Sequence, residues 1–498
     1  MRRIDGFFDQ LAAHGDQVAI AGAGAARTYR ALLTDVDAWC RYLDAAGART
    51  VAYRLPNGVD WIALDLALLR SGRVAIPIPD FFSPAQEAHA LATAGVDHYV
   101  TSGPVPDGFA TMDLVHGLRL LKAAADTPVT LHPGTAKVTF TSGTTGTPKG
   151  VCLSADQLLA TAGAIEQALG GEGIRQHLCA LPLSLLLENV AGVYASLGNG
   201  SRIAVPDLGD IGLTGSSGLD VQAFVEGQHR YRPQSLILVP QLLLALTAAS
   251  EFGLRLPDSY RFIAVGGGKI APSLLDRAQA AGLPVYEGYG LTECGSVVAV
   301  NLPGASSPGT VGRPLPHVSV GIVDGEIQVI GNAMLGYVGD PDRPSRIATG
   351  DLGGLDLDGY LTVLGRRKSG FITAYGRNVS PEWIESELTA EIAIAQALVF
   401  GDALPGNVAL IVPRGSSGED AIATAVAAAN ARLPDYARVS NWHVIDPETF
   451  STAGCLTENG RPRRDVAARC FDRQLQSMYE RLQETAHAAL RQAGERHP

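Results

Sequence analysis

Short apolar runs alternate with alanine-rich amphipathic stretches over about the first 130 residues. The runs at 73–79 and 97–102 are typical of buried strands, and the stretches at 60–72 and 85–95 are typical of helices. The same alternation returns later in the chain, where expected strands cover 137–143, 201–206, 234–240, 261–268 and 283–290. Strands that alternate with helices form mostly parallel sheets. The pattern therefore predicts two consecutive α/β regions.

The spacing changes between about 305 and 364 to short strands joined by turns. Asp324-Gly325 and Asp358-Gly359 each stand between runs of alternating polarity. Asp-Gly is a strong hairpin signal because both residues tolerate positive φ. We expect a small β-rich subdomain here.

The remaining residues predict a small α+β domain after the segment 365–370. Its last part, 472–494, has Leu475, Met478, Leu482 and Leu490 near one helical face. Such a face most often packs on its own domain, and a partner or homodimer contact is the alternative. The predicted fold class is α/β: a large N-terminal domain of two parallel-sheet α/β subdomains and a β-rich subdomain, followed by an α+β C-terminal domain.

Composition narrows the class of protein. Of the 498 residues, 46% are hydrophobic and 18% charged, and the net charge is −11, without the lysine and arginine clusters that bind nucleic acid. The six cysteines have no metal-ligand spacing, which favours free thiols in a reducing compartment. No signal peptide and no run long enough to span a bilayer is evident. We expect a cytoplasmic enzyme.

The segment TSGTTGTPKG at 141–150 follows an expected strand and has no helix or strand composition. Backbone N–H groups and hydroxyls without bulky side chains suit the oxygens of a polyphosphate. Lys149 adds one cation in a chain that contains only five lysines, and Pro148 stiffens the approach to it. A flexible linker is the alternative, but linkers rarely follow an apolar strand. The lysine lacks P-loop spacing, so this is a different kind of phosphate loop.

The segment FTSGTTGTPKGV resembles the first signature of the adenylate-forming superfamily, which contains acyl-CoA synthetases, the adenylation domains of peptide synthetases and luciferases. YEGYGLTECG (286–295), VGGGKI (265–270), TGDLG (349–353) and GRRKSGFITAYGRNVSPEWIE (365–385) resemble further signatures in the same order. The resemblance covers about residues 15–465. It implies an N-terminal adenylation core over 1–364, a hinge over 365–370 and a mobile C-terminal domain over 371–498.

The resemblance assigns roles to residues of this chain. Tyr289 would stack on adenine, Thr292 would contact the α-phosphate, and Glu293 would hold Mg²⁺. Asp351, assisted by Arg366, would bind the ribose hydroxyls, while Lys368 would lie at the hinge. The implied ATP-binding segments comprise Thr141, Ser142, Gly143, Thr144, Thr145, Gly146, Gly266, Gly267, Gly268, Glu287, Gly288 and Gly290, and the loop with Gly376 would line a channel for pantetheine.

The superfamily joins an acid to AMP, releases pyrophosphate and passes the acyl group to an acceptor. Near the C-terminus, LTENGRPRR (456–464) resembles the last signature, but Arg461 stands where the superfamily has a catalytic lysine. Arginine binds phosphate well, so we favour a conserved role in catalysis with Lys149, Thr292 and Glu293. The alternative is a nucleotide binder with slow, altered or lost adenylation.

The acid and the acceptor are less well defined. LPLSLLLENVAGVYASLGNG (181–200) is similar to long-chain acyl-CoA synthetases, although Leu185 replaces their usual histidine. No aspartate for an α-ammonium is evident, which disfavours an amino acid. Leu185, Leu186, Leu187, Val239 and Leu242 suggest an apolar pocket for a fatty or aromatic acid, with core packing as the alternative for each. Glu188 could be a helix-start charge. The expected acceptor is the thiol of CoA, and a carrier-protein phosphopantetheine or an amine stays open.

Overall fold

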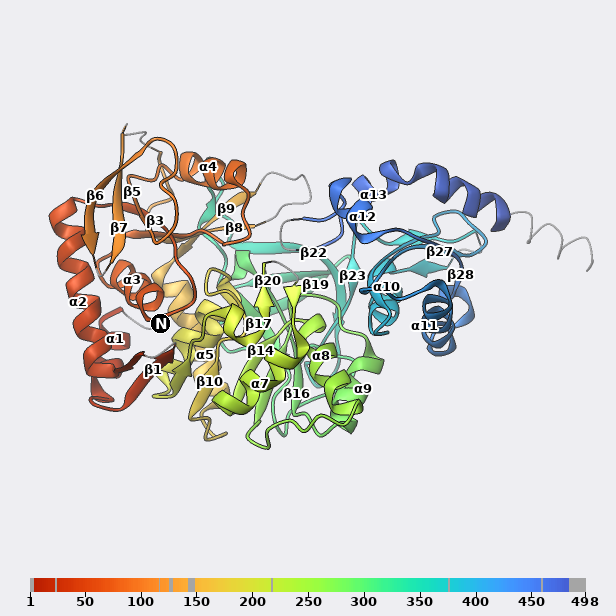
Figure 1. Ribbon diagram of the computed structural model, residues 1–498, viewed down its shortest axis with the longest axis horizontal. Coiled ribbons are helices and arrows are strands. Elements are labelled where there is room, and N and C mark those ends of the chain that lie inside the picture. Colours follow the sequence, from red (N-terminus) through yellow and green to blue (C-terminus); the bar gives the residue numbers. More distant parts are fainter. Residues whose placement is uncertain are drawn as a thin grey trace, which may run out of the picture.

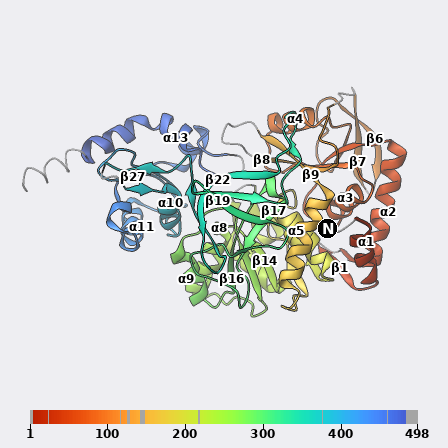
Figure 2. The ribbon, with the colours of Figure 1, turned by 180° about the vertical axis from the view of Figure 1, so that it is seen from behind.

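A computed structural model describes residues 4–22, 25–115, 117–124, 129–141, 148–215, 218–374, 377–457 and 460–482. A large N-terminal body carries a smaller C-terminal domain at one side, and the same two lobes are seen from behind (Figures 1 and 2). Among the described residues, no helix combines the length and the apolar character needed to cross a bilayer.

The first sheet of the body has eight strands in the order β21-β9-β8-β4-β3-β5-β7-β6. Their bounds are β3 (Thr50–Arg54), β4 (Val74–Pro77), β5 (His98–Thr101), β6 (Phe109–Val115), β7 (Leu118–Ala123), β8 (Thr135–Thr141), β9 (Lys149–Ser154) and β21 (Gly336–Tyr337). The four central strands β8, β4, β3 and β5 are parallel, and antiparallel strands flank them on both sides.

The second sheet has nine strands in the order β18-β17-β16-β15-β14-β10-β11-β1-β2. Their bounds are β1 (Val18–Gly22), β2 (Ala25–Thr28), β10 (Gln176–Leu178), β11 (Arg202–Ala204), β14 (Ser235–Leu238), β15 (Phe262–Val265), β16 (Val285–Leu291), β17 (Ser296–Val300) and β18 (Arg313–Pro314). β16, β15, β14, β10, β11 and β1 are parallel, and the edges are antiparallel. A separate short pair joins β12 (Leu213–Thr214) to β13 (Gly218–Leu219).

Helices fill three layers around these sheets. The helices of the body are α1 (Ile4–Ala13), α2 (Tyr29–Ala46), α3 (Val59–Arg70), α4 (Pro84–Thr93), α5 (Ala155–Leu169), the π-helix η1 (Leu187–Tyr194), α6 (Ala195–Gly198), η2 (Leu208–Ile211), α7 (Val221–Tyr231), α8 (Pro240–Glu251), α9 (Pro272–Ala280) and η3 (Thr292–Cys294). One hydrophobic core joins both sheets to α1, α2, α3, α5 and η1, so this helical layer is shared. α7, α8 and α9 cover the other face of the second sheet, and α4 covers the other face of the first.

A buried ion pair fixes η1 to the first sheet. Lys137 Nζ on β8 lies 2.7 Å from Asp65 Oδ1 on α3 and 2.5 Å from Asn189 Oδ1 on η1. Tyr194 of η1 also donates to Asp65. Burial lowers the pKa of the Lys137 ammonium, and the Asp65 carboxylate opposes that shift. Lys137 therefore has a structural role, because a buried charge must be paired and its partners Asp65 and Asn189 supply that pairing.

The expected β-rich subdomain is a sheet in the order β19-β20-β22-β23, with bounds β19 (Ser319–Val323), β20 (Glu326–Ile330), β22 (Arg346–Leu355) and β23 (Leu361–Arg366). Asp324 and Gly325 have φ values of 49° and 76°, so the predicted two-residue hairpin between β19 and β20 is confirmed. The second hairpin, with Asp358-Gly359, is also present but uses the longer connection 356–360.

The C-terminal domain contains a short pair, β24 (Phe371–Ile372) with β25 (Asn378–Val379), and a sheet of β26 (Ile394–Phe400), β27 (Asn407–Pro413) and β28 (Val439–Val444). Its helices are α10 (Pro381–Thr389), α11 (Glu419–Arg432), η4 (Asp435–Ala437), α12 (Pro447–Thr452) and α13 (Arg464–Cys470). A further helix over 472–482 buries Leu475 and Met478 in the domain core. That part of the predicted amphipathic helix packs on its own domain, whereas Leu490 lies outside the described residues.

The α/β class is confirmed, and the central strands of both large sheets are parallel as expected, while hairpins such as β6–β7 and β8–β9 add antiparallel strands at the edges. One expectation needs correction. The first 130 residues do not form one sheet, because β1 and β2 join the second sheet. Local alternation identifies strands, but the partner of a strand depends on long-range packing.

Candidate active site

Two glycine segments meet at the carboxyl edge of the second sheet. Gly266, Gly267 and Gly268 follow β15, and Gly288 lies on the neighbouring strand β16. A Cβ atom on Gly266 would stand 3.2 Å from the carbonyl oxygen of Gly288, and Gly267 has a φ of +79°. Side chains are therefore disfavoured here, and the backbone of both segments stays accessible, as a flat ligand requires.

A bulge in β16 sets the direction of the next turn. The register with β17 shifts between Tyr289 and Gly290, and a Cβ on Gly290 would overlap the carbonyl oxygen of Ser296. The chain then enters the 3₁₀ turn η3, which contains Thr292 and Glu293. Ser296 itself has a φ of +102°, rare for a residue with a side chain. This local strain holds the turn beside the glycine segments.

Tyr289, Asp351 and Arg366 form one cluster, although their positions in the chain are far apart. The Tyr289 hydroxyl donates to Asp351 Oδ2 over 2.7 Å, and Arg366 Nε lies 3.0 Å from Asp351 Oδ1. Asp351 and Arg366 are cross-strand partners on β22 and β23, and Arg366 also donates to the carbonyl of Thr349. The structure thus brings together three of the residues to which the sequence assigns adenine and ribose.

Burial and neighbouring charges have opposing effects on the pKa values of this cluster. Burial raises the pKa of the Asp351 carboxyl, while the Arg366 guanidinium and the hydrogen bond from Tyr289 lower it. Burial and the Asp351 carboxylate raise the pKa of the Tyr289 hydroxyl, which remains protonated and able to donate. The side chain of Asp351 is only 9% exposed, whereas that of Arg366 is 57% exposed. A carboxylate positioned by two donors is suited to accept hydrogen bonds from vicinal hydroxyls.

Glu293 lies close to the base of the phosphate loop. Tyr337 Oη donates to Glu293 Oε1 over 2.9 Å, and Lys149 Nζ lies 5.3 Å from the centre of the Tyr337 ring. Tyr337 is on β21, which pairs with β9, the strand that begins at Lys149. The other carboxylate oxygen of Glu293 has no hydrogen-bond partner among the described residues. A hard oxygen ligand next to a cation is the donor set that Mg²⁺ and phosphate require.

Part of the predicted site lies outside the described residues, namely Ser142, Gly143, Thr144, Thr145, Gly146 and Gly376. Thr141 ends β8 and pairs with Lys149, so the two ends of the loop are adjacent. His89 also contacts the carbonyl of Pro148 over 3.1 Å. Lys368 is exposed on the turn that follows β23 and is not part of the Tyr289–Asp351–Arg366 cluster.

Arg461 reaches this edge from the C-terminal domain. Its Nη2 donates to the carbonyl oxygen of Gly267 over 2.5 Å. The N–H and the hydroxyl of Thr457 donate to the carbonyl of Arg461, and the N–H of Arg461 donates to the Thr457 hydroxyl. Solvent still reaches the guanidinium, but crowding by the protein and the charge of Arg366 lower its pKa. Two guanidinium groups, one from each lobe, therefore act on each other at this edge.

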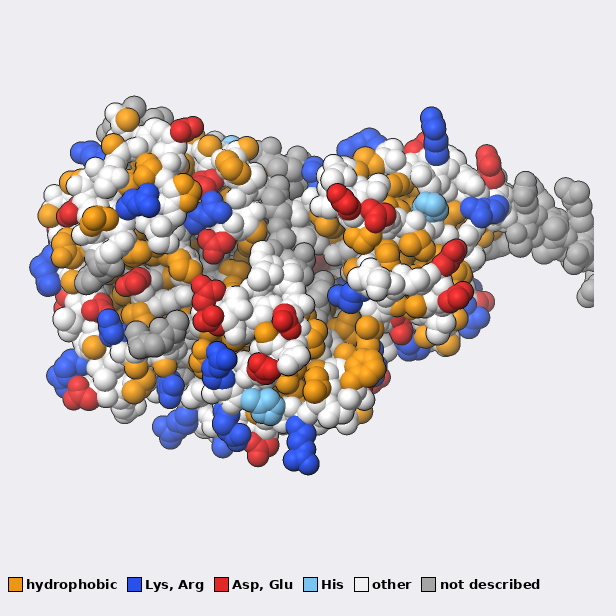
Figure 3. Space-filling view, in the orientation of Figure 1, with side chains coloured by type: hydrophobic (Ala, Val, Ile, Leu, Met, Phe, Trp, Pro, Cys, Tyr) orange, Lys and Arg blue, Asp and Glu red, His pale blue; other side chains and the backbone are white. Residues whose placement is uncertain are grey.

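The C-terminal domain contacts the body at a second point. Ser273 of α9 donates to Glu387 of α10 over 2.8 Å, and Arg277 donates to the carbonyl of Ala390 over 2.9 Å. The two lobes lie side by side in the space-filling view (Figure 3).

Glu287, which lies in the second glycine segment, has a strongly raised pKa. Burial raises its pKa to about 7, and the ammonium of Lys269 opposes this shift. Lys269 donates to the carbonyl of Val363 over 2.7 Å, which holds its charge between the second sheet and β23. Glu287 can therefore exchange a proton close to neutral pH.

An apolar cavity of about 80 Å³ lies between the second sheet and the helices α5, η1 and α6. Leu187, Ala191, Ala264 and Val297 line it, and Val297 is the register partner of Gly290. Of the five residues predicted for the pocket, only Leu187 lines this cavity. Leu186 and Leu242 are buried, and Leu185 and Val239 pack on a separate core. Val239 also adjoins the glycine segment, because a Cβ on Gly267 would lie 3.6 Å from its Cγ1.

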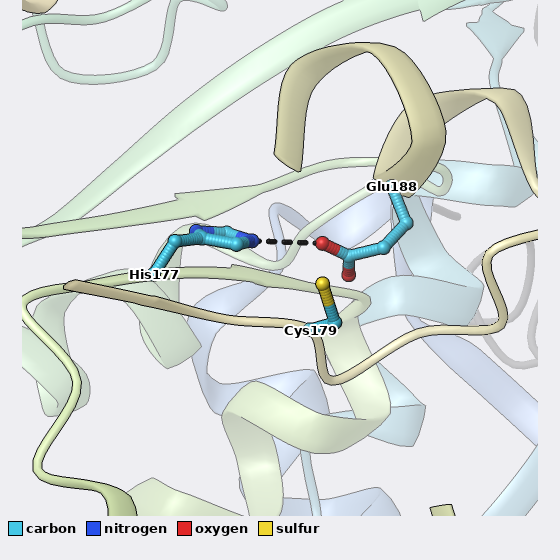
Figure 4. Close-up of side chains that lie close together, drawn as sticks. All are labelled: His177, Cys179 and Glu188. Atoms are coloured by element: carbon cyan, nitrogen blue, oxygen red, sulfur yellow. Dashed lines mark hydrogen bonds and ion pairs between the residues drawn. The ribbon is translucent and has the colours of Figure 1, made fainter. Parts of the chain in front are cut away.

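Two polar residues of the cavity wall were not predicted. His177 of β10 and Ser235 of β14 both line the cavity and are register partners. Glu188 does lie in the first turn of η1, as considered from the sequence, and its buried side chain contacts His177, with Cys179 below them (Figure 4). The three side chains come from positions with no motif spacing, so the sequence carried no signal for this cluster.

Family models match almost the whole chain. The model described as AMP-binding enzyme matches residues 7–337, and the model of the AMP-binding enzyme C-terminal domain matches residues 369–483. A long-chain-fatty-acid–CoA ligase of Mycobacterium bovis is 26% identical over 530 positions, which cover 87% of this chain and 88% of that protein.

Solved structures share the fold. An o-succinylbenzoate CoA synthetase of Bacillus subtilis, solved with its acyl-adenylate intermediate, has a TM-score of 0.71 and 23% identity, covering 92% of this chain and 97% of that one. The same synthetase has also been solved with ATP and magnesium. The amide bond synthetase McbA of Marinactinospora thermotolerans has a TM-score of 0.72 and 24% identity, covering 94% of this chain and all (100%) of that one.

Proposed function

The chain belongs to the AMP-binding enzyme family, and from that premise we propose that it is an acid–thiol ligase. It uses ATP to activate a hydrophobic carboxylic acid as an acyl-adenylate, releases pyrophosphate, and transfers the acyl group to the thiol of CoA. The relatives named for CoA ligation support both half-reactions.

The observation that carries the proposal is the convergence of side chains from both lobes on the glycine edge. Arg461 donates to Gly267, while Tyr289, Asp351 and Arg366 form a closed cluster at the same edge. Adenylation requires a carboxylate and a phosphate to approach each other, and their like charges must be offset. Arg461 can bind two oxygens at once in that position. We therefore keep the interpretation that it performs the task of the usual lysine.

Each remaining group of the site has a role in this proposal. Asp351 accepts from the ribose hydroxyls, the Tyr289 ring faces the adenine, and the backbone at Gly266–Gly268 lets the base lie flat. Thr292 and Lys149 contact the phosphates. The donor set at Glu293 suits Mg²⁺, which when bound supplies positive charge to the phosphate oxygens.

The C-terminal domain turns about the hinge 365–370 between the two half-reactions. β23 ends at Arg366 and β24 begins at Phe371, so only a short turn, with Lys368 exposed on it, separates the two lobes. Closure keeps water from the mixed anhydride, and rotation then exposes the segment with Gly376 to pantetheine. Near α9 two hydrogen bonds join the lobes, and Ala390 packs against the core beside α9; rotation would break these contacts.

The acid is fatty or aromatic. The cavity between the second sheet and α5, η1 and α6 is lined mainly by aliphatic side chains, which suit a hydrophobic acid. An acid in this cavity would bring its carboxylate to the edge at which Arg461 and Glu293 lie.

Pyrophosphate release tests the proposal. The full chain is incubated with ATP, Mg²⁺ and a panel of fatty, aryl and inorganic acids, with and without CoA. We expect pyrophosphate and AMP with hydrophobic acids, and acyl-CoA when CoA is present. Lys149→Ala should raise the KM for ATP roughly tenfold by removing a phosphate contact, and Lys122→Ala, an exposed lysine on β7, is the control.

The acceptor is decided in the same assay. If AMP formation depends on an amine or on a carrier protein rather than on CoA, the acceptor is that amine or carrier protein, and the proposed transfer to CoA is wrong. ATP binding without turnover of any acid would identify a nucleotide binder and refute the proposal.

A further inference from the structure

Six polar residues line the cavity, namely Glu166, His177, Ser196, Asn199, Ser201 and Ser235. His177 and Ser235 lie on its sheet wall. Ser235 is the first residue of β14 and His177 lies at the start of β10, so both belong to the amino edge of the parallel strands. The glycine segments lie at the opposite edge. From Phe262, the partner of Ser235, to Gly266 the strand advances about 13 Å at ~3.3 Å per residue. A carboxylate at the glycine edge therefore places the distal part of a medium chain near Ser235.

A chain of hydrogen bonds holds Ser235. Its Oγ lies 2.9 Å from His177 Nδ1, and His177 Nε2 lies 2.8 Å from Glu188 Oε1. The other oxygen of Glu188 accepts from the backbone N–H of Leu181 over 3.1 Å. Glu188 is fully buried, and the His177 side chain is 3% exposed. The sequence of contacts is therefore Ser235, His177, Glu188, Leu181.

We assign the N–H of an uncharged His177 to Nε2, where the Glu188 carboxylate can accept it. Nδ1 is then an acceptor, and the Ser235 hydroxyl donates to it. In this assignment Ser235 Oγ presents only lone pairs to the cavity. In an apolar cavity, such an acceptor favours a ligand that can donate a hydrogen bond, because an unpaired polar group there is costly.

The same cluster does not have the properties of a metal site. The ligand atoms of His177, Cys179 and Glu188 lie within 4.8 Å of one another (Figure 4). However, both nitrogens of the imidazole and both oxygens of the carboxylate already have partners. Burial and the Glu188 carboxylate also raise the pKa of the Cys179 thiol well above its usual value, which disfavours the thiolate that a metal needs.

We propose that Ser235, positioned by His177 and Glu188, binds a hydroxyl on the distal part of the acid, so that the preferred substrate is a hydroxylated rather than a plain hydrophobic acid. This inference rests on the proposed function, because it assumes that the acid occupies this cavity. Ser235 would touch the substrate, whereas His177 and Glu188 are positioning residues.

Matched acids test it. The kcat/KM for pyrophosphate release is compared for octanoic, decanoic and dodecanoic acids, their ω-hydroxy forms and their ω-methoxy forms, and binding of each acid is measured in parallel by calorimetry. At the best length, we expect the hydroxy acid to exceed its methoxy form about tenfold, the ratio that one net hydrogen bond provides.

Substitutions test whether Ser235 and its partners cause the preference for the hydroxy acid. Ser235→Ala should lower kcat/KM and affinity for the hydroxy acid about tenfold and leave the plain acid within twofold. Ser259→Ala is the matched control, because it also removes a partly buried hydroxyl, which donates to Pro233 outside the cavity. Glu188→Gln tests the proton assignment. The N–H of Leu181 should still donate to the amide oxygen of the glutamine, so the amide N–H₂ faces His177. The amide then donates to His177, and the direction of each hydrogen bond from there to Ser235 is reversed. Ser235 then becomes a donor, and the preference for hydroxy over methoxy acid should disappear.

The outcomes separate the two proposals. Turnover of plain and hydroxy acids alike, unchanged by Ser235→Ala, would overturn this inference and leave the ligase function standing. Without any turnover the ligase function fails, and the calorimetric comparison of wild type with Ser235→Ala still decides the inference. Stoichiometric zinc in the purified protein, lost in Glu188→Gln, would overturn it as well.

Discussion

The two edges of the nine-stranded sheet are built in different ways. At the carboxyl edge, contiguous glycine segments leave the backbone open, and side chains from three parts of the chain meet above them: Tyr289, Asp351 and Arg461. At the amino edge, His177 and Ser235 are isolated polar residues on short buried strands, aligned only by the register of β10 with β14. The first edge is partly exposed, and the second is almost completely buried.

The difference concerns what each edge has to recognise. A phosphate or a flat base needs close approach to the backbone, which imposes glycine and small hydroxyl residues at successive positions. A single hydroxyl needs only one acceptor of fixed orientation, and one serine with two supporting residues is sufficient. Changes at the carboxyl edge should therefore affect every acid equally, and changes at the amino edge should depend on the acid.

The largest effect is expected at the carboxyl edge from Asp351→Ala. Arg366 and Tyr289 would lose their common acceptor and the nucleotide its ribose contact, so pyrophosphate release should fall roughly a hundredfold for all acids, as expected for two hydrogen bonds to a charged group. Initial rates with a hydroxylated and a plain acid measure this. Asp358→Ala, at an exposed turn, is the control. A loss confined to one acid would contradict the separation of the two edges.

Arg461→Ala should lower pyrophosphate release about tenfold, again without regard to the acid, because one cation near the reacting oxygens is lost. Arg461→Lys should retain adenylation or accelerate it. Stopped-time assays of both variants and of Arg469→Ala, an exposed arginine on α13, provide the comparison. Complete inactivity of Arg461→Lys would show that the guanidinium has a task that an ammonium cannot perform.

Gly192→Ala tests the amino edge from a neighbouring residue. A Cβ there would overlap Glu188 Oε1 and stand 2.8 Å from His177 Nε2, so the added methyl group must separate the pair. We expect a loss of about 2 kcal/mol in the free energy of unfolding and loss of any selectivity for hydroxylated acids. Gly6→Ala is the matched control, because this helical glycine has nothing within 4 Å of the added atom. Chemical denaturation and the ratio of rates for matched acids are the measurements.

The smallest effect concerns the pH dependence at Glu287. Its pKa rises from 4.5 to about 7 in the folded protein. A carboxyl with a raised pKa favours folding when protonated, so stability should decline as pH rises from about 4.5 to 7 and level off above that. Glu287→Gln removes this dependence. The Tm of the variant relative to wild type should therefore be higher at pH 8 than at pH 5, and an equal difference at both values would exclude the shift.

Much of the fold and part of the site could be predicted from the amino-acid sequence. Period-two and period-3.6 patterns located the strands and helices, and Asp324-Gly325 specified its hairpin because only a few residues adopt positive φ. The glycine segments, Asp351 and Arg366 were proposed from their resemblance to known signatures, and the structure pairs Asp351 with Arg366. Close approach to a nucleotide restricts residue types over several successive positions, so a motif results.

Tertiary structure alone decided the rest. It assigned β1 and β2 to the second sheet, left Leu187 alone of five candidates at the cavity, and gave Lys137 a buried partner in Asp65. It also aligned His177 with Ser235 and turned Glu188 inward. Strand register and helix facing depend on contacts between residues far apart in the chain, and no local pattern encodes them.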